Sequence, residues 1–397
     1  MNRAGLSLCL MVPFFLSACA ENETQRLTQT QHPSPPPLHA VQVDLDYVYD
    51  PDPEQEVHNI DRLVDYIATL QINAVFLQAF ADPQGTGLAR ALYFPNRHLP
   101  MRQNLFPLVA EQIQSRAHVQ VYGWLPVLSY NFDEGVARVL AWSPARSVAE
   151  PDAKAYKRIS PFDPEGRKRI LEIYEDLARQ APINGLLFHD DALLSDFEDA
   201  SPPALQAYAV AGFPDSVQII RDDPDLMGRW TSFKTESLIA FTQELTERVR
   251  QYRTPLVTVR NIYATPILNP LSEIWFAQNY NRFCAVYDYT AILAMPALEN
   301  VPSARSDTWL EQLAAAVATQ PDKGSHTIFE LQSVDWRKDP DDATRPVSAA
   351  SLTAQMRLLA RQGVVNMAYY PADFIKDQPR AQDLRPDFSL FGMEARP

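Results

Sequence analysis

The stretch Val-Gln-Val-Asp-Leu-Asp-Tyr-Val-Tyr-Asp-Pro-Asp-Pro, residues 41–53, decides between two common α/β architectures. Its first seven residues read as a strand, and an amphipathic helical pattern at 55–70 separates it from a second strand candidate at 73–80. Strands that alternate with helices pair in parallel. An open, doubly wound sheet normally carries a glycine-rich phosphate turn after strand one, and 44–53 has none. The stretch therefore favours a closed barrel.

The alternation continues along the chain and predicts a (β/α)₈ barrel of the TIM type, in the α/β class. Polar, proline-rich loops follow the strand candidates, and barrel enzymes build their sites from such loops at the carboxyl ends of the strands. The further strand candidates are 119–128, 185–190, 256–262, 289–295, 327–332 and 364–369. Helical patterns lie at 103–116, 166–179, 231–250, 306–319 and 348–361, and the long loops at 80–102, 129–164, 191–229, 263–288 and 333–347.

The N-terminal region has the pattern of a signal peptide. Arg3 precedes an apolar stretch, 6–16, that is too short to span a bilayer. The sequence Leu-Ser-Ala-Cys at 16–19 resembles a bacterial lipobox, which predicts lipid on Cys19, whereas an ordinary signal peptide with an incidental cysteine is the alternative. Ala20 favours the outer membrane. We expect a signal at 1–19, a disordered tether at 20–40, a barrel domain at 41–397, and a periplasmic protein whose lipid lies in the inner leaflet of the outer membrane.

Composition excludes several classes of partner. The net charge of −14 argues against nucleic acid and anionic lipid and favours a cationic or neutral partner. No zinc-ligand spacing or nucleotide-binding loop is present, so we expect no metal and no cofactor. Once Cys9 is removed with the signal and Cys19 is lipidated, only Cys284 remains, which predicts a fold without a disulfide.

Carboxylates, amides and aromatic residues recur at the predicted strand ends. Aromatic faces stack on sugars or cations, and carboxylates bind hydroxyl and ammonium groups, so the pattern predicts a site for a polar, ring-shaped substrate. The predicted binding residues are Asp44, Asp46, Tyr47, Gln78, Arg97, His98, Trp124, His189, Arg260, Asn261, Tyr263, Tyr287, Asp288, Glu330, Gln332, Trp336, Tyr369 and Tyr370.

The segment His-Asp-Asp-Ala-Leu-Leu-Ser-Asp-Phe-Glu-Asp, 189–199, follows the apolar run 185–188 and holds five carboxylates. Such a cluster is costly to desolvate and indicates cation binding, metal binding or acid–base chemistry. Cleavage of a glycosidic bond requires one protonated and one ionised carboxyl group. We take Asp191 as the general acid, with Asp190 or Asp196 as its partner and Glu198 as a fourth candidate.

Structural roles compete with these assignments. Ser195, Asp196 and Asp199 could cap the following helix or hold the loop. Arg260 and Asn261 could form a buried ion pair with Glu330 across the top of the barrel. His189 could ligate a metal, but further histidine or cysteine ligands at suitable positions are missing from the sequence. A nucleophilic serine motif of the Gly-x-Ser-x-Gly type is absent as well.

Four stretches together resemble the C-terminal glycoside-hydrolase domain of PgaB-type proteins, which process poly-β-1,6-N-acetylglucosamine, a biofilm exopolysaccharide. They are 43–53, Tyr-Phe-Pro-Asn-Arg-His-Leu-Pro-Met-Arg at 93–102, 189–199 and Phe-Glu-Leu-Gln-Ser-Val-Asp-Trp-Arg at 329–337. The resemblance implies a (β/α)₈ barrel with an acidic groove for partially de-N-acetylated, cationic polymer.

The resemblance leaves two functions open. The first is an endo-acting glycosidase of the β-1,6-hexosaminidase type that uses carboxylate acid–base chemistry. The second is a non-catalytic lipoprotein that binds the same polymer and guides it to an export machinery. Family members normally carry a deacetylase domain ahead of the barrel, and here 20–40 reads as a short tether, so we expect no N-deacetylase activity.

Overall fold

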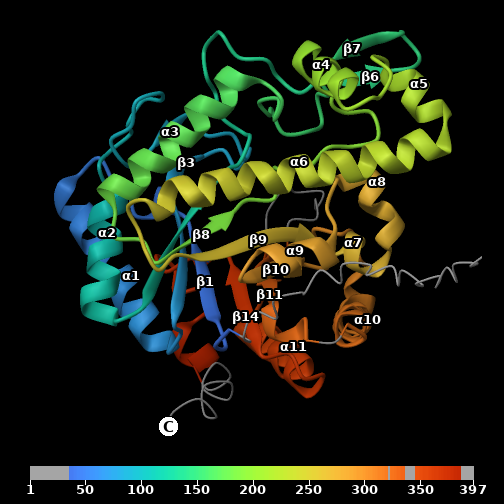
Figure 1. The fold of residues 1–397 in the computed structure, drawn as a ribbon. Helices are drawn as coiled ribbons and strands as arrows, with labels where there is room; N and C mark the ends of the chain where they lie inside the picture. Colours follow the sequence, from blue (N-terminus) through green and yellow to red (C-terminus); the bar gives the residue numbers. More distant parts are fainter. Residues whose placement is uncertain (1–34, 321, 336–344, 386–397) are drawn as a thin grey trace, which may run out of the picture. The chain divides into compact units, whose positions relative to one another are not determined.

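A closed barrel of eight parallel strands is confirmed by the computed structural model, which describes residues 35–320, 322–335 and 345–385. Neighbouring strands pair in the order β1-β14-β11-β10-β9-β8-β5-β2, which closes on itself (Figure 1). Every pair is parallel, as the strand–helix alternation requires. The barrel strands are β1 (His39–Val43), β2 (Ala74–Gln78), β5 (Gln120–Leu125), β8 (Gly185–Phe188), β9 (Val257–Tyr263), β10 (Tyr289–Ala294), β11 (Thr327–Gln332) and β14 (Asn366–Tyr370).

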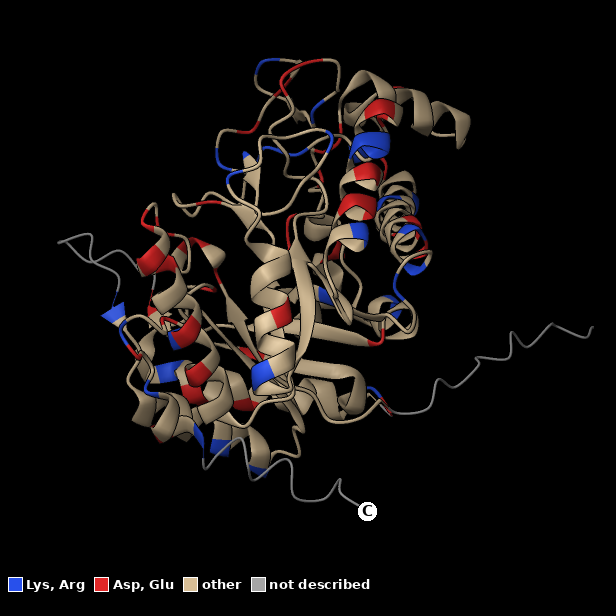
Figure 2. Cartoon of the chain, turned by 90° about the vertical axis from the view of Figure 1, so that its left-hand side faces the viewer, with Lys and Arg blue, Asp and Glu red and all other residues tan. Residues whose placement is uncertain are grey.

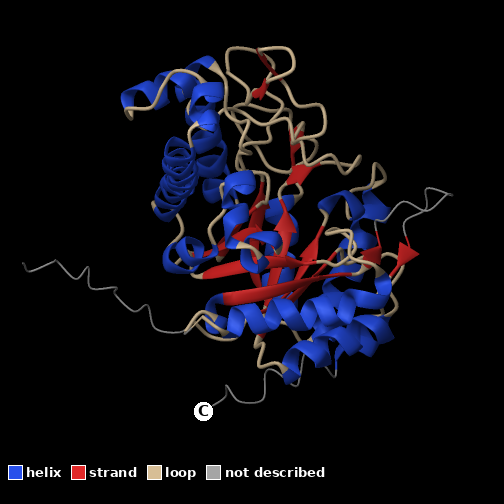
Figure 3. Cartoon of the chain, turned by 90° about the vertical axis from the view of Figure 1, so that its right-hand side faces the viewer, coloured by secondary structure: helices blue, strands red, loops and turns tan. Residues whose placement is uncertain are grey.

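The barrel strands lie inside a layer of helices (Figure 3). Because one face of each strand meets the helices and the other meets the barrel interior, all residues of β1, β2 and β11 are buried. The helices are α1 (Pro53–Leu70), α2 (Phe106–Gln112), α3 (Pro164–Gln180), α4 (Pro202–Val210), α5 (Val217–Asp222), α6 (Pro224–Arg250), α7 (Thr265–Leu268), α8 (Glu273–Phe276), α9 (Tyr280–Val286), α10 (Ser306–Ala318) and α11 (Ala349–Arg361).

Three helices begin at the same dipeptide, Asp-Pro. Asp52, Asp163 and Asp223 are the N-cap residues of α1, α3 and α6, and each carboxylate accepts a hydrogen bond from a backbone N–H of the first turn. The proline that follows has no N–H to satisfy and already has a helical φ angle. These pairs therefore set the points at which the chain turns from a loop into a helix.

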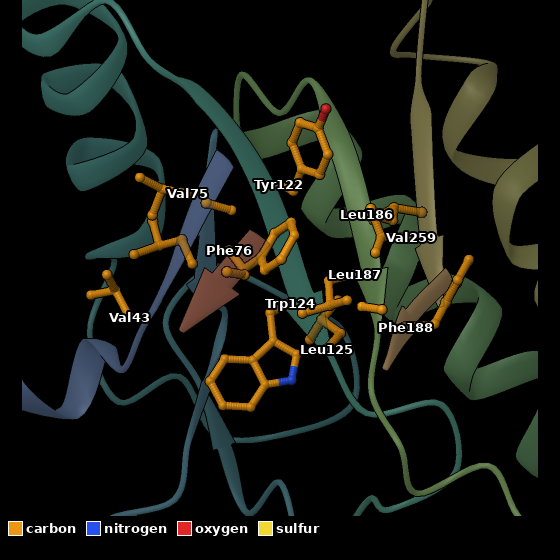
Figure 4. Packing of buried hydrophobic residues seen from close by; sticks show 14 of the residues in the cluster. Val43, Val75, Phe76, Tyr122, Trp124, Leu125, Leu186, Leu187, Phe188 and Val259 are labelled. Carbon is orange, nitrogen blue, oxygen red and sulfur yellow. The ribbon is translucent and has the colours of Figure 1, made fainter. Parts of the chain in front are cut away.

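The hydrophobic core is formed between the strands and the helices. Side chains of β2, β5 and β8 pack against one another in Figure 4, among them Phe76, Tyr122 and Leu187. Charged residues lie mainly on the helices and loops, and the barrel strands carry few of them (Figure 2). A charged residue on a barrel strand, such as Glu330, is therefore an exception that requires an explanation.

A second hydrophobic cluster lies in the long insertion after β8. Trp230 of α6, Tyr208 of α4 and Val217 of α5 are buried together in it. Figure 1 shows α4 and α5 beside the N-terminal part of α6, next to the hairpin of β6 (Ala141–Ser143) and β7 (Val148–Glu150). Two shorter pairs, β3 (Phe80–Ala81) with β4 (Ala91–Leu92) and β12 (Val334–Asp335) with β13 (Arg345–Pro346), lie in other loops that follow barrel strands.

The barrel begins slightly earlier than the sequence pattern predicted. β1 starts at His39, which lies inside the segment 20–40 assigned to the tether, and it ends at Val43, before the acidic residues of 44–46. Cys19 and the other residues of the predicted signal lie outside the described residues. None of the described helices combines the length and the apolar character needed to cross a bilayer.

Gly185 permits the close approach of β8 and β9. A Cβ atom at this position would lie 2.6 Å from the carbonyl oxygen of Val257, a backbone atom that cannot move aside without disturbing the barrel. We expect Gly185→Ala to lower the free energy of unfolding by about 1–3 kcal/mol, as overpacked core substitutions do. Denaturation with guanidinium chloride measures this change.

Gly228→Ala is the matched control. Gly228 lies in α6, and a Cβ atom there would meet nothing within 4 Å. We expect this variant to be more stable than the wild type by about 0.5–1 kcal/mol, because alanine is the better helix former. Equal stability of the two variants would show that the β8–β9 contact does not restrict residue size at 185.

Candidate active site

The carboxyl ends of the barrel strands bring together many of the polar residues predicted from the sequence. Residues that follow or end β1, β2, β5, β8, β9, β11 and β14 lie at the same end of a parallel barrel. The predicted residues placed there are Asp44, Asp46, Tyr47, Gln78, Trp124, His189, Asp190, Asn261, Tyr263, Glu330, Gln332 and Tyr370.

Asp190 is the most strongly supported carboxylate of this set. Tyr263 Oη donates to Asp190 Oδ2 at 2.6 Å, Tyr156 Oη lies 3.3 Å from both carboxylate oxygens, and His189 Nε2 lies 2.9 Å from Oδ1. Burial raises the pKa of Asp190, but the charge of His189 and these hydrogen bonds outweigh it and hold the pKa at about 2. Asp190 is therefore ionised at neutral pH.

His189 is the counterpart of this charge. Burial lowers its pKa, but the charge of Asp190 and the hydrogen bonds to Asp190 and Asp191 raise it to about 10. His189 is therefore protonated at neutral pH and forms a buried ion pair with Asp190.

Glu330 has the opposite protonation state. Its side chain is fully buried in β11, and burial raises its pKa to about 8, with a further contribution from the negative charge of Asp190. Asn261 Nδ2 donates to Glu330 Oε2 at 2.9 Å and opposes the shift only in part. Glu330 Oε1 is buried and accepts no hydrogen bond from the described residues. Glu330 is thus a protonated acid at neutral pH, and one of its two buried oxygens has no hydrogen-bond partner among the described residues.

A second carboxyl group with a raised pKa, Asp44, directly follows β1. Burial, together with the charge of Asp46, raises the pKa of Asp44 to about 7. Tyr370 Oη donates to Asp44 Oδ1 at 3.5 Å and opposes the shift. Asp44 is therefore partly protonated at neutral pH, and Tyr47, which is 39% exposed, lies three residues after it.

Trp124 contacts both His189, which follows β8, and Tyr370, which ends β14. Its ring centroid lies 5.7 Å from that of His189, 5.6 Å from that of Tyr370 and 5.4 Å from that of Phe80. Trp124 Nε1 is buried and has no hydrogen-bond partner among the described residues. An aromatic surface with one unsatisfied donor is suited to a ring that carries hydroxyl groups.

Asp46 serves the loop 80–102. Its carboxylate accepts hydrogen bonds from Tyr93 Oη at 2.6 Å, from Arg102 Nη1 at 2.9 Å and from the backbone N–H of Asp82 at 2.8 Å. The guanidinium of Arg102 also stacks on Tyr49, 4.1 Å from the ring centroid. Asp46 is thus engaged by protein donors and positions this loop over the strand ends.

Asp191 holds the backbone of the next loop. Its carboxylate accepts three backbone hydrogen bonds, from Val127 at 2.9 Å and from Leu128 and Ser129 at 2.7 Å, and the residue is not exposed. Because these donors occupy both oxygens, the geometry assigns Asp191 a positioning role. We therefore no longer take it as the general acid.

The other two acids predicted to be catalytic are paired with arginines. Asp196 Oδ2 accepts from Arg221 at 2.7 Å, and Glu198 Oε1 accepts from the buried Arg158 at 2.7 Å. The loop-holding alternative fits Asp196, for which it was predicted, and the ion pair gives Glu198, for which it was not, a structural role as well. Asp199 likewise accepts hydrogen bonds from the backbone N–H groups of Leu140 and Ser201. Arg260 also has a structural role, because its guanidinium donates hydrogen bonds to the carbonyl oxygens of His189 and Ala192.

Five predicted binding residues do not join the site and are withdrawn from it. Arg97 and His98 bind Asp176 and Glu172 on the surface of α3. The remaining three contact the barrel wall or its opposite end: Tyr287 and Asp288 precede β10, where they contact Thr242 and Thr258, and Tyr369 faces Tyr66 of α1. Trp336 lies outside the described residues.

Tyr156 is a site residue that sequence reasoning missed. It lies in the loop 129–164, far in sequence from the end of any barrel strand, and its Oη reaches Asp190 while its ring packs on Gly87. A Cβ atom on Gly87 would lie 2.3 Å from Tyr156 Cε1. The sequence Lys-Ala-Tyr-Lys at 154–157 contains no pattern that distinguishes Tyr156 from an exposed loop residue.

A cavity of about 510 Å³ adjoins Asp190, because Tyr156 and Tyr263, which both contact Asp190, form part of its wall. Among the residues that the structure describes, no group of three or more His, Cys, Asp or Glu side chains is placed to hold a metal ion. The lining residues are Thr86, Leu88, Arg90, Lys154, Ala155, Tyr156, Lys157, Leu193 and Tyr263.

A barrel with an ionised and a protonated carboxyl group among aromatic rings at its strand ends has the features of a glycoside hydrolase. Residues 42–370 match the family described as hypothetical glycosyl hydrolase family 13 (GHL13), and the chain belongs to this family.

Two relatives define the comparison further. The chain is 44% identical over 337 residues to a poly-β-1,6-N-acetyl-D-glucosamine N-deacetylase of Escherichia coli K12, which covers 85% of this chain and 50% of the relative. It therefore spans about half the length of the curated relatives it matches. The structure of the PgaB (BpsB) glycoside hydrolase domain from Bordetella bronchiseptica is 45% identical, with a TM-score of 0.82, and the match covers 89% of this chain and 99% of that domain.

A β-galactosidase from the psychrophilic Marinomonas ef1 matches with a TM-score of 0.58 and 10% identity, over 90% of this chain and 59% of that one. This likeness shows the fold alone. The chain is accordingly a glycoside-hydrolase domain related to PgaB, and the resemblance found in the sequence is confirmed.

The role of Asp191 can be tested by stability. We expect Asp191→Asn to lower the free energy of unfolding by about 1–3 kcal/mol, because the amide oxygen cannot satisfy all three N–H donors and the amide NH₂ faces them. Asp65→Asn, on the exposed face of α1, is expected to change stability by less than about 0.5 kcal/mol. An Asp191→Asn variant as stable as the wild type would remove the positioning role.

Proposed function

We propose that this protein is an endo-acting glycoside hydrolase that cleaves partially de-N-acetylated poly-β-1,6-N-acetylglucosamine by carboxylate catalysis. The observation that carries the proposal is the opposite protonation of Asp190, with a pKa of about 2, and Glu330, with a pKa of about 8. Pairs of titratable groups whose environments separate their pKa values in this way are the usual acid and base of an active site.

The two groups have complementary roles in this proposal. Glu330 donates its proton to the leaving glycosidic oxygen, and Asp190, kept ionised by His189 and the two tyrosines, stabilises positive charge at the anomeric centre or activates the attacking group. Burial keeps Glu330 protonated at neutral pH until substrate binds, so a proton is present for donation, and its Oε1 has no hydrogen-bond partner among the described residues. Asp190 and Glu330 thus replace the pair that included Asp191.

The identity of the polymer rests on the relatives and on charge. The matched E. coli protein is named for poly-β-1,6-N-acetyl-D-glucosamine, and the matched Bordetella domain is a glycoside hydrolase domain of PgaB. Removal of acetyl groups leaves ammonium groups on the polymer, and a chain with a net charge of −14 attracts them. An ammonium group bound beside Asp44 would favour the ionised form of that carboxyl group.

Hydrolysis and the identity of the acid are tested together. Wild-type protein incubated with partially de-N-acetylated polymer is expected to yield shorter oligosaccharides by mass spectrometry. Glu330→Gln keeps the size of the side chain and removes the proton, so we expect the turnover number to fall by about 100-fold or more with polymer binding retained.

Asp44→Asn is the matched variant for this experiment, since it also replaces a buried carboxyl group that can hold a proton at neutral pH. We expect it to lower turnover by less than about tenfold. A larger loss in Asp44→Asn than in Glu330→Gln would transfer the donor role to Asp44. Binding without any product from the wild type would reject the hydrolase and favour the polymer-binding lipoprotein.

The pKa values also predict the pH dependence. Asp190 is ionised above about pH 2 and Glu330 is protonated below about pH 8, so both groups are in the required state between these limits. At saturating substrate, turnover should be constant near neutral pH and fall as the pH rises through about 8, where Glu330 loses its proton. Turnover that rises through this range would contradict Glu330 as the acid.

We also propose that the protein is a periplasmic lipoprotein held by lipid on Cys19, through which it would meet an exopolysaccharide export machinery. The pattern Leu-Ser-Ala-Cys at 16–19 supports this proposal. Expressed in a Gram-negative host, the wild type is expected in the outer-membrane fraction and Cys19→Ser in a membrane-free fraction. The control is Cys284→Ser, which changes a cysteine of the barrel domain and should stay in the membrane fraction. Wild-type protein in the membrane-free fraction would contradict the lipid anchor.

A further inference from the structure

Strand β9 lies between the two carboxyl groups of the proposed catalytic pair. Its neighbours are β8, which Asp190 follows, and β10, beyond which β11 carries Glu330. Asn261 and Tyr263 lie two residues apart on β9, so their side chains are on the same face of the strand. Each donates a hydrogen bond to one of the two carboxyl groups. One face of a single strand therefore contacts both groups.

The contact with Glu330 depends on a small residue of the strand that separates β9 from β11. Asn261 pairs in register with Ala291 of β10, and both residues are buried. The methyl group of Ala291 leaves space for the amide of Asn261 to reach past β10, and its Nδ2 donates to Glu330 Oε2 at 2.9 Å. The register of three strands thus fits the amide to the carboxyl group.

This contact determines which oxygen of Glu330 carries the proton. In a protonated carboxyl group one oxygen donates and the other accepts. Because Oε2 accepts from Asn261, the proton is placed on Oε1, which has no hydrogen-bond partner among the described residues. Besides burial and Asn261, the charges of Asp190 and His189 act on the pKa of Glu330, and both of these residues follow β8.

Tyr263 acts on the other carboxyl group. Its Oη donates to Asp190 Oδ2 at 2.6 Å, a charge-assisted hydrogen bond to the ionised carboxylate. Burial raises the pKa of Asp190, but the charge of His189 and the hydrogen bonds from Tyr263 and Tyr156 lower it. The ring of Phe276 packs on that of Tyr263 with the centroids 5.3 Å apart, which restricts the tyrosine to this orientation.

The opposite face of β9 joins the strand to the loop that carries Asp190. Arg260, adjacent to Asn261, is buried on that face and donates to the carbonyl oxygens of His189 and Ala192. The position of the loop relative to β9 is therefore fixed through the backbone as well as through Tyr263.

We propose that Asn261 and Tyr263 are positioning residues, which fix the orientation of Glu330 and Asp190 from one face of β9. The proposal rests on the proposed function, because it takes these two carboxyl groups as the reacting pair. It adds that one strand holds both groups, so that a shift of β9 would displace the acid and its partner together.

The pH dependence of turnover separates the two roles. Tyr263→Phe removes a donor to ionised Asp190, so the pKa of Asp190 should rise by about 1 and the acidic limb should move to higher pH. Asn261→Ala removes a donor to Glu330, so the pKa of Glu330 should rise above about 8 and the alkaline limb should move to higher pH. Each variant should leave the other limb in place. Turnover between the limbs should fall by about tenfold or more, with KM within about twofold of the wild type.

Three further variants serve as controls. Asn261→Leu fills the space that Asn261→Ala leaves empty, so the same shift in both variants attributes it to the lost donor. Asn59→Ala removes a buried amide of α1, and Tyr280→Phe removes a buried hydroxyl group that contacts Thr327. These last two should leave both limbs and the turnover number unchanged.

Carbon-13 nuclear magnetic resonance of the side-chain carboxyl groups measures both pKa values without substrate, and Asp190→Asn and Glu330→Gln assign the signals. Three results would overturn the proposal: unchanged pKa values, equal movement of both limbs in each variant, and failure of both Asn261 variants to fold. The pKa shifts in a protein that does not cleave the polymer would retain the role of β9 and reject the hydrolase. Cleavage by the wild type with unshifted pKa values in the variants would do the reverse.

Discussion

The three backbone hydrogen bonds that end on Asp191 join the loop after β5 to the loop after β8, and the chemistry of the neighbouring residue depends on them. With Asp191 fixed below, Asp190 is presented to Tyr156, Tyr263 and His189. Arg260 reinforces this arrangement through the carbonyl oxygens of His189 and Ala192. Two adjacent aspartates thus divide the work, since one stabilises the backbone and the other carries the reactive charge.

The ionisable groups around Asp190 differ in charge. Asp190 and His189 neutralise one another, and Glu330 stays protonated in the barrel interior. The cavity beside Asp190 is lined in part by Arg90, Lys154 and Lys157. On the β1 side Asp46 is neutralised by Arg102, and Asp44 keeps a raised pKa. The net charge of the whole chain therefore does not describe the field at any one point of the site.

The order of barrel strands and of the main helices between them could be predicted from the sequence, because each barrel strand is a short apolar run and these helices have an amphipathic period. The helices inside the predicted loops 191–229 and 263–288, such as α4 and α9, were not predicted. The site could be predicted only to the level of the strand end, since parallel strands bring their carboxyl ends together whatever the side chains do. Which face of a strand a residue occupies is harder to predict. Tyr369 and Tyr370 are adjacent, yet one faces α1 and the other faces Asp44. Tyr287 and Asp288 were predicted to bind substrate, but they precede β10, whose first residue is Tyr289, and so lie away from the carboxyl end of that strand. The roles of Asp191 and Glu198 depended on donors about 40 to 64 residues away, which no local pattern reveals.

The ring of Tyr156 packs so closely on Gly87 that the two long loops carrying these residues leave no space for a side chain at 87. Loops at the mouth of a barrel usually diversify separately, and new substrate ranges arise by lengthening one of them while the others stay unchanged. Here a larger residue at 87, or a shift of the segment around 156, would displace both loops. Homologues that acquire a different saccharide preference should therefore alter these two positions jointly, and a library that randomises one loop alone would discard most of its members for steric reasons.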